Sequence, residues 1–171
     1  LLRDTLSTNS DAASTHMVTF WRRADGSEGG SFTFTLGSGH TGAAGGIVAF
    51  SGVDTGTAIN VSGETQTASG FSHAASSIST TVASTMLVSS HAFASTTSDW
   101  TPPSGMTEAV DAASVTRPDV AGMSIEMNFA TQSAAGATGT KTPTAASAGT
   151  DAGNGVVHSP ALRPAPEGLN C

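Results

Sequence analysis

The side chains that could do acid–base or metal chemistry are few, and no short motif groups them. The histidines are His16, His40, His73, His91 and His158. None belongs to an H-E-x-x-H pattern or to a closely spaced Cys/His set, so a zinc site has no support in the sequence. A Ser-His-Asp site assembles across space, but residues 37–40 lack the spacing of a G-x-S-x-G nucleophile elbow. We therefore expect no catalytic residue, no metal ion and no cofactor.

Close carboxylate pairs raise the question of glycoside hydrolysis, which uses two acids roughly 5–10 Å apart in a cleft. Glu108 with Asp111, and Asp25 with Glu28, are near each other in the sequence. Both pairs fall at predicted turns or strand ends. This position is typical of solvated turn carboxylates, and we interpret them in that way.

Calcium is a further alternative for the acidic loop residues. Asp54, Asp99 and Asp151 each fall in a predicted loop, where a carboxylate could join backbone carbonyls around a hard cation. The sequence contains no D-x-[DN]-x-[DN]-G loop, so we predict no calcium site.

Trp100 is the single residue most suggestive of ligand binding. It follows Asp99 and precedes two prolines, which fix the backbone of the loop. A rigidly held amphipathic ring of this kind could stack on a sugar, with Asp99 as a polar contact. The alternative is that Trp100 packs down as a lid over the end of the fold.

Composition excludes several classes of partner. The chain has 6 Lys and Arg against 13 Asp and Glu, a formal net charge of −7. Nucleic-acid binding needs clustered cations, so we expect no such partner. No stretch of 18 apolar residues is present, and we expect no membrane insertion. Cys171 is the only cysteine, so no disulfide forms within the chain.

Alternation of apolar and polar residues is the main structural signal, and Gly-rich turns separate the alternating stretches. We predict strands over residues 14–23, 31–36, 47–50, 59–61, 77–82, 85–94, 106–113, 122–131, 138–145 and 155–162. Strands at this spacing predict an all-β, antiparallel, two-sheet β-sandwich of jelly-roll type, with almost no helix.

The expected core lies between the two sheets. Its members are Phe32, Phe34, Leu36, Ile47, Ala49, Met86, Val88, Ile125, Met127 and Phe129. Residues 31–36 are expected to form a strand with one wet face. Residues 47–50 are a continuous apolar run, which is typical of a central strand covered on both sides.

The order of motifs resembles a known module. FWRRA, SFTFTL, GGIVAFSGVDT, STMLVSS, TPPSGMTE, AAGATGT and VVHSPALRPA occur in this order. The series resembles an uncharacterised module of phage tail-fibre and decoration proteins and of bacterial secreted surface proteins. This resemblance implies a jelly-roll-like β-sandwich on a virion or cell surface, and it brings no catalytic residues.

The resemblance also implies a segment before Leu1. We therefore expect residues 1–163 to form one domain that lacks its first strands, with residues 164–171 as a tail or the start of a linker. Leu1 to Leu6 should be paired in a sheet.

These observations together predict a non-enzymatic structural module of an extracellular or virion-surface assembly, such as a fibre, spike or capsid decoration. Its expected partners are other copies of itself or neighbouring structural subunits. The alternative is a carbohydrate-binding or adhesive module that recognises surface glycans.

Overall fold

The longest alternating stretches of the sequence form the middle of a five-stranded antiparallel sheet. Its strands are β3 (Ile59–Thr67), β5 (Thr85–Ala94), β7 (Thr107–Ala113), β8 (Met123–Gln132) and β11 (Gly155–Leu162). They are hydrogen-bonded in the order β3-β11-β5-β8-β7. The predicted bounds of β5 and β11 agree with the structure. The expected short edge strand near residues 59–61 extends to nine residues in β3.

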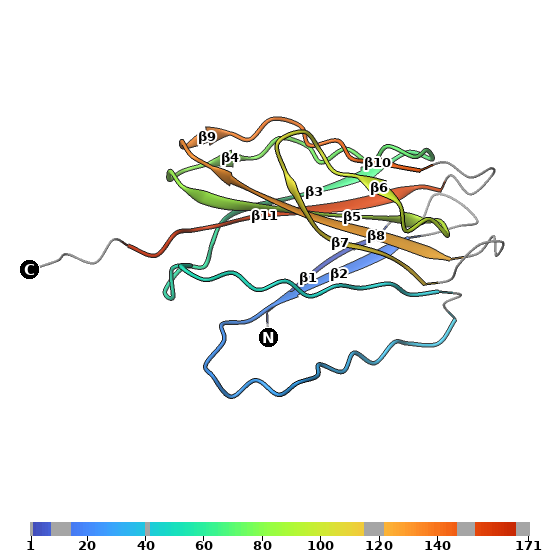
Figure 1. The fold of residues 1–171 in the computed structure, drawn as a ribbon, viewed down its shortest axis with the longest axis horizontal. Coiled ribbons are helices and arrows are strands. Elements are labelled where there is room, and N and C mark those ends of the chain that lie inside the picture. The colour runs from blue at the N-terminus through green and yellow to red at the C-terminus, as the bar shows by residue number, and fades with distance from the viewer. Residues whose placement is uncertain (1, 8–14, 40–41, 115–121, 147–152, 167–171) are drawn as a thin grey trace, which may run out of the picture.

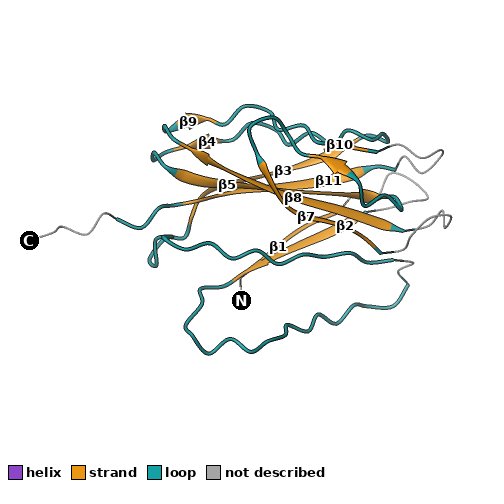
Figure 2. Ribbon diagram, viewed as in Figure 1, coloured by secondary structure: helices purple, strands orange, loops and turns teal. Residues whose placement is uncertain are grey.

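The computed structural model describes residues 2–7, 15–39, 42–114, 122–146 and 153–166, with side chains from residue 15 onward. Within these ranges the chain forms eleven strands, every strand pairing is antiparallel, and no helix is present. Figure 2 shows this all-β architecture. The predicted all-β antiparallel fold class is confirmed.

Four two-residue strands form a layer over one face of the five-stranded sheet. β4 (Ser79–Thr80) pairs with β9 (Gly136–Ala137), and β6 (Trp100–Thr101) pairs with β10 (Thr144–Ala145). These strands and their connecting residues, 68–82, 95–106 and 136–146, are called the cover below. The cover lies above the sheet in Figure 1. The predicted strands over residues 77–82 and 138–145 are therefore present only as short pieces of the cover.

A second pair of strands lies on the opposite side of the sheet. β1 (Leu2–Ser7) pairs with β2 (His16–Trp21) in Figure 1. This confirms the expected sheet pairing for Leu2 to Leu6, whereas Leu1 lies outside the described residues. Met17 of β2 packs on Ala92 and Val156, which project from the face of the sheet away from the cover.

The two faces of the sheet have separate hydrophobic clusters. Under the cover, Phe93 packs against Trp100 and Ala145, with a Phe93–Trp100 ring distance of 5.2 Å. A second cluster on this face joins Ile78 of the cover to Leu87 and Ala161. Because both faces are covered, the central strands β5 and β11 are mostly buried, whereas the outer strands β3 and β7 keep exposed residues.

The expected core is only partly correct. Val88 is buried, and four more of its members are half-buried: Met86, Ile125, Met127 and Phe129. The other five members are exposed: Phe32, Phe34, Leu36, Ile47 and Ala49. Moreover, residues 31–36 and 47–50 form no strand, so both strand predictions were wrong. Alternation describes the side-chain pattern of a strand, but it does not supply a neighbouring strand with which to pair.

The end of the described chain bonds back to the body. Pro164 forms a bridge with Val53, and the Ala165 N–H donates to the Gly52 carbonyl at 2.7 Å. The first two residues of the expected tail are thus attached to the turn at residues 52–54.

Two phenylalanines provide a matched test of this core. We expect Phe93→Ala to lower the free energy of unfolding by about 3–5 kcal/mol, because its fully buried side chain leaves a cavity among aromatic rings. Phe34→Ala should cost less than about 1 kcal/mol, because the Phe34 side chain is 53% exposed. Urea unfolding of dilute protein measures both. An equal loss for the two variants would place residues 31–36 in the core.

Candidate functional site

Trp100 lies in the cover with its ring against the sheet. The side chain is 5% exposed, and its Nε1–H donates to the Ser124 hydroxyl at 2.7 Å. The Ser124 hydroxyl in turn donates to the Thr97 carbonyl at 2.5 Å. This packing corresponds to the lid alternative. A stacked sugar needs an open ring face, so the glycan contact at Trp100 stays a prediction that requires the cover to move.

Asp99 does not share a surface with the Trp100 ring. Its side chain is exposed, while its backbone is fixed inside the cover. The Asp99 carbonyl accepts the Ala146 N–H at 2.7 Å, and the Asp99 N–H donates to the Thr97 hydroxyl at 3.2 Å. The Asp99 side chain is therefore exposed while the Trp100 side chain is buried, so the two predicted ligand side chains do not form one surface that a glycan could contact.

The sheet face beneath the cover carries a row of buried polar side chains. In β8, Ser124, Glu126 and Asn128 are 0% exposed, whereas the apolar residues between them are only half-buried. The strand register sets Glu126 between His91 of β5 and Asp111 of β7. This set (Asp111, Glu126, Asn128, His91 and Ser89) is called the polar row below.

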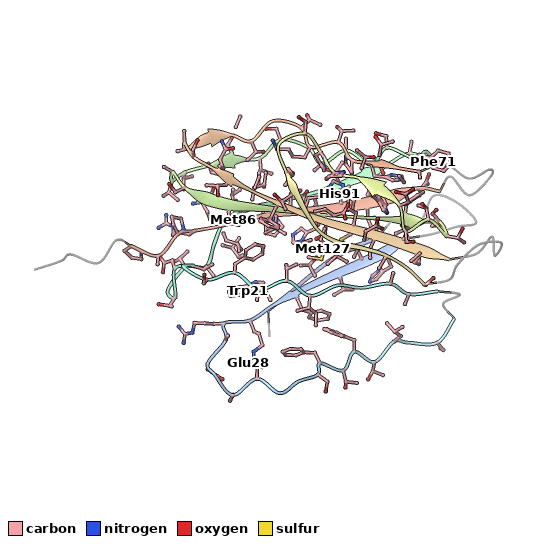
Figure 3. The ribbon with its side chains drawn as sticks, viewed as in Figure 1. Trp21, Glu28, Phe71, Met86, His91 and Met127 are labelled. Atoms are coloured by element: carbon pink, nitrogen blue, oxygen red, sulfur yellow. The ribbon has the colours of Figure 1, made fainter. Side chains whose placement is uncertain are left out.

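His91 connects the polar row to the cover. Its Nδ1–H donates to the His73 carbonyl at 2.7 Å, so its Nε2 is left to accept a hydrogen bond from the Ser89 hydroxyl at 3.0 Å. Burial lowers the pKa of His91 to about 4, which keeps the ring neutral at pH 7. Figure 3 places His91 inside the body and Phe71 in the cover.

His73, the second buried histidine, belongs to the cover and connects it to β3. The His73 Nδ1 lies 2.6 Å from the Thr67 hydroxyl of β3, and burial lowers the pKa of His73 to about 4. Gly155 makes this close approach possible, because a Cβ at that position would overlap the His73 ring. The two neutral histidines therefore connect three elements without placing a charge in the interior.

A hydroxyl–imidazole pair such as Ser89 with His91 is also the start of a nucleophilic site. Here both side chains are 0% exposed, and a backbone carbonyl occupies the place where a triad has a carboxylate. Without a route for substrate to the hydroxyl, the pair as placed fastens the cover to the sheet.

Glu126 is the chemically unusual member of the polar row. Neither carboxylate oxygen receives a hydrogen bond of normal geometry from a described residue, and the same holds for the Asn128 amide atoms. Burial raises the pKa of Glu126 to about 7; the neighbouring Asn128 amide lowers it, and Glu108 and Asp111 raise it further. Near neutral pH this carboxyl is therefore protonated in a large fraction of molecules.

Asp111 is held at the rim of the same row. Its Oδ2 accepts the Trp100 backbone N–H at 3.0 Å, so the carboxylate fixes the position at which the cover crosses β7. Burial raises the pKa of Asp111, and the nearby charges of Glu108 and Asp99 raise it as well. The interpretation of Glu108 and Asp111 as solvated turn carboxylates is therefore wrong for Asp111: both residues lie within β7, and Glu108 is exposed whereas Asp111 is half-buried.

The other acidic candidates have local structural roles. Asp54 Oδ1 accepts the Gly56 and Thr57 N–H groups in a turn, at 2.7 and 3.1 Å. Glu28 forms an exposed ion pair with Arg22 at 2.7 Å. Asp151 lies outside the described residues. Within the described part of the chain, no three His, Cys, Asp or Glu side chains are grouped to hold a metal ion.

Residues 29–39 form the second unusual feature, called the apolar segment below. All eleven residues are exposed, and none of them has an ionisable side chain. The segment runs outside the body at the bottom of Figure 1, and no hydrogen bond joins it to another described residue. Its Phe34 ring contacts only Phe20 of β2 among the described aromatic side chains, at a centroid distance of 5.5 Å.

A comparison with protein-family models, with curated proteins and with solved structures found no match. In the part of the chain that the structure describes, no helix has the length and apolar character needed to cross a membrane.

Glu126 was not among the residues that the sequence singled out. Its neighbours Ile125 and Met127 are apolar, so alternation assigned Glu126 to a wet face. No signal in the sequence indicates that the cover closes over that face.

The buried carboxyl predicts an unusual pH dependence of stability. The Glu126 carboxyl has a pKa of about 7 in the folded protein and near 4.5 in the unfolded chain, so the stabilisation that it provides is complete below about pH 4.5 and is lost progressively between pH 4.5 and 7. His73 and His91 act in the opposite direction, between about pH 4 and 6.5. The two histidines outweigh the single carboxyl, so we expect stability to rise from about pH 4.5 to 6.5 with roughly half the slope that the histidines alone would give, and to change little between about pH 6.5 and 8.

Substitution of Glu126 separates its contribution to the pH dependence of stability from that of His73 and His91. Glu126→Gln removes the opposing contribution, so the rise in stability between about pH 4.5 and 6.5 should become about twice as steep. The matched control is Glu64→Gln, an exposed carboxyl on β3 that should preserve the whole profile. Denaturant unfolding at a series of pH values measures this. A rise that is no steeper in Glu126→Gln than in the unsubstituted chain would contradict the assignment.

Proposed function

We propose that this chain is a non-enzymatic structural module of an extracellular or virion-surface assembly, and that it associates with other copies of itself or with neighbouring subunits. The observation that carries the proposal is the exposed apolar segment. Phe32, Phe34 and Leu36 are 44%, 53% and 55% exposed. With Phe20 they leave on the order of 400 Å² of apolar side-chain surface in water, taking roughly 200 Å² for each side chain. Patches of this size on a monomer often mark interaction sites.

The character of the rest of the molecule favours the same function. Only 11% of the residues are charged, so hydroxyl and small side chains dominate the exposed surface. The groups best suited to acid–base chemistry, Glu126 and His91, are 0% exposed beneath the cover. The glycan-binding alternative needs an open aromatic face, and the 5% exposure of Trp100 does not favour it.

Self-association should depend on the apolar segment. We expect the unsubstituted chain to show a concentration-dependent rise in mass between about 1 and 100 µM, and Phe34→Lys to weaken this association at least about tenfold, because the lysine would be buried in an apolar contact. Sedimentation velocity measures the mass.

The matched control is Thr107→Lys, which adds the same charge to an exposed position at the edge of the sheet. It should associate like the unsubstituted chain. A chain that stays monomeric over the whole range, or one that only Thr107→Lys weakens, would contradict the proposed association through this segment.

A further inference from the structure

The apolar segment has the composition of a strand that lacks a neighbour. Residues 31–36 read S-F-T-F-T-L, so an extended backbone places Phe32, Phe34 and Leu36 on one side and the threonines on the other. None of these residues makes a hydrogen bond to another described part of the chain. An extended segment with free backbone groups and a pattern of this kind is a template for strand addition.

We propose that a second copy of this chain supplies that neighbour, by antiparallel pairing of residues 31–36 about a two-fold axis at Phe34. This inference rests on the proposed function and names the surface and geometry of the association. In this register Phe34 lies opposite its own counterpart, Phe32 lies opposite Leu36, and Thr33 lies opposite Thr35. Aromatic and aliphatic cross-strand pairs are favourable, and the same patch serves both partners, as a two-fold interface requires.

Charge favours this segment over the other available edges. Two copies with a net charge of −7 repel each other, and this repulsion is weakest at a contact that brings no charged groups close together. Residues 29–39 meet this condition. The outer strands of the five-stranded sheet do not, because β3 carries Glu64 and β7 carries Glu108 and Asp111. Pairing of two copies through either of those edges would bring like charges together.

The available area also fits a second copy. The roughly 400 Å² of apolar side-chain surface is about half of the approximately 800 Å² that each partner of a standard stable interface buries. The backbone and hydroxyl side chains of residues 29–39, all exposed, provide the remaining surface. Residue Ile47, 64% exposed on the neighbouring segment, adds further apolar surface.

Site-specific cross-linking tests the register directly. In a Cys171→Ser background, which removes the only native cysteine, Phe34→Cys should form a disulfide-linked dimer on mild oxidation. Directly opposed residues of an antiparallel pair lie about 4.5–5.5 Å apart at Cα, which suits a disulfide. Phe32→Cys alone should stay monomeric, because its own counterpart lies four residues away along the strand. An equimolar mixture of Phe32→Cys and Leu36→Cys should cross-link.

The outcomes separate this inference from the proposed function. Sedimentation of the unsubstituted chain is run in parallel. If it self-associates while Phe34→Cys fails to cross-link, or while Phe32→Cys alone cross-links equally well, the two-fold register is wrong and association by another geometry stands. If the chain is monomeric and no variant cross-links, both proposals fail.

Discussion

The fold depends on one constraint: a sheet face lined with polar side chains is buried, so its polar groups need partners in the layer above it. Burying a polar group without a hydrogen bond costs about 1–3 kcal/mol, which is a large fraction of the stability of a domain. The cover meets this need at specific points. The His73 carbonyl accepts a hydrogen bond from the His91 Nδ1–H, and the Ser124 hydroxyl links the Trp100 ring to the Thr97 carbonyl. These contacts fix the position of the cover, and hence of the two hydrophobic clusters beneath it.

The Glu126 carboxyl receives no such hydrogen bond from the cover, and protonation lowers the cost of burying it. An ionised carboxylate with no partner would be far more costly to bury than a neutral carboxyl, so the group retains its proton to about pH 7. The titratable groups buried between the cover and the sheet are thus largely neutral: His73 and His91 are uncharged, and the Glu126 carboxyl is protonated in a large fraction of molecules at neutral pH. A buried layer of this kind holds the cover against the sheet.

The sequence predicted where individual strands form better than it predicted which segments pair or pack against them. β5 and β11 were located correctly because their apolar content and flanking turns are strong local signals. Residues 31–36 have an equally clear alternation, yet pairing depends on a neighbour that alternation does not specify. The polar row was missed for a related reason. An alternating strand is usually read as having one wet face, whereas β8 is covered on both, so Glu126 and Asn128 are buried more completely than Ile125.

The scarcity of large side chains connects the fold to the proposed association. The chain has 7 Phe, 2 Trp and no Tyr, and Phe93 and Trp100 are committed to the cluster under the cover. Phe32 and Phe34 remain outside, on a segment that has no backbone hydrogen bond to another described residue. The most direct test of their role is amide hydrogen exchange of residues 31–36 as a function of protein concentration. We predict rapid exchange in dilute protein and clear protection at concentrations where the mass rises. Equally rapid exchange in the associated protein, with new protection in β3 or β7, would contradict the account.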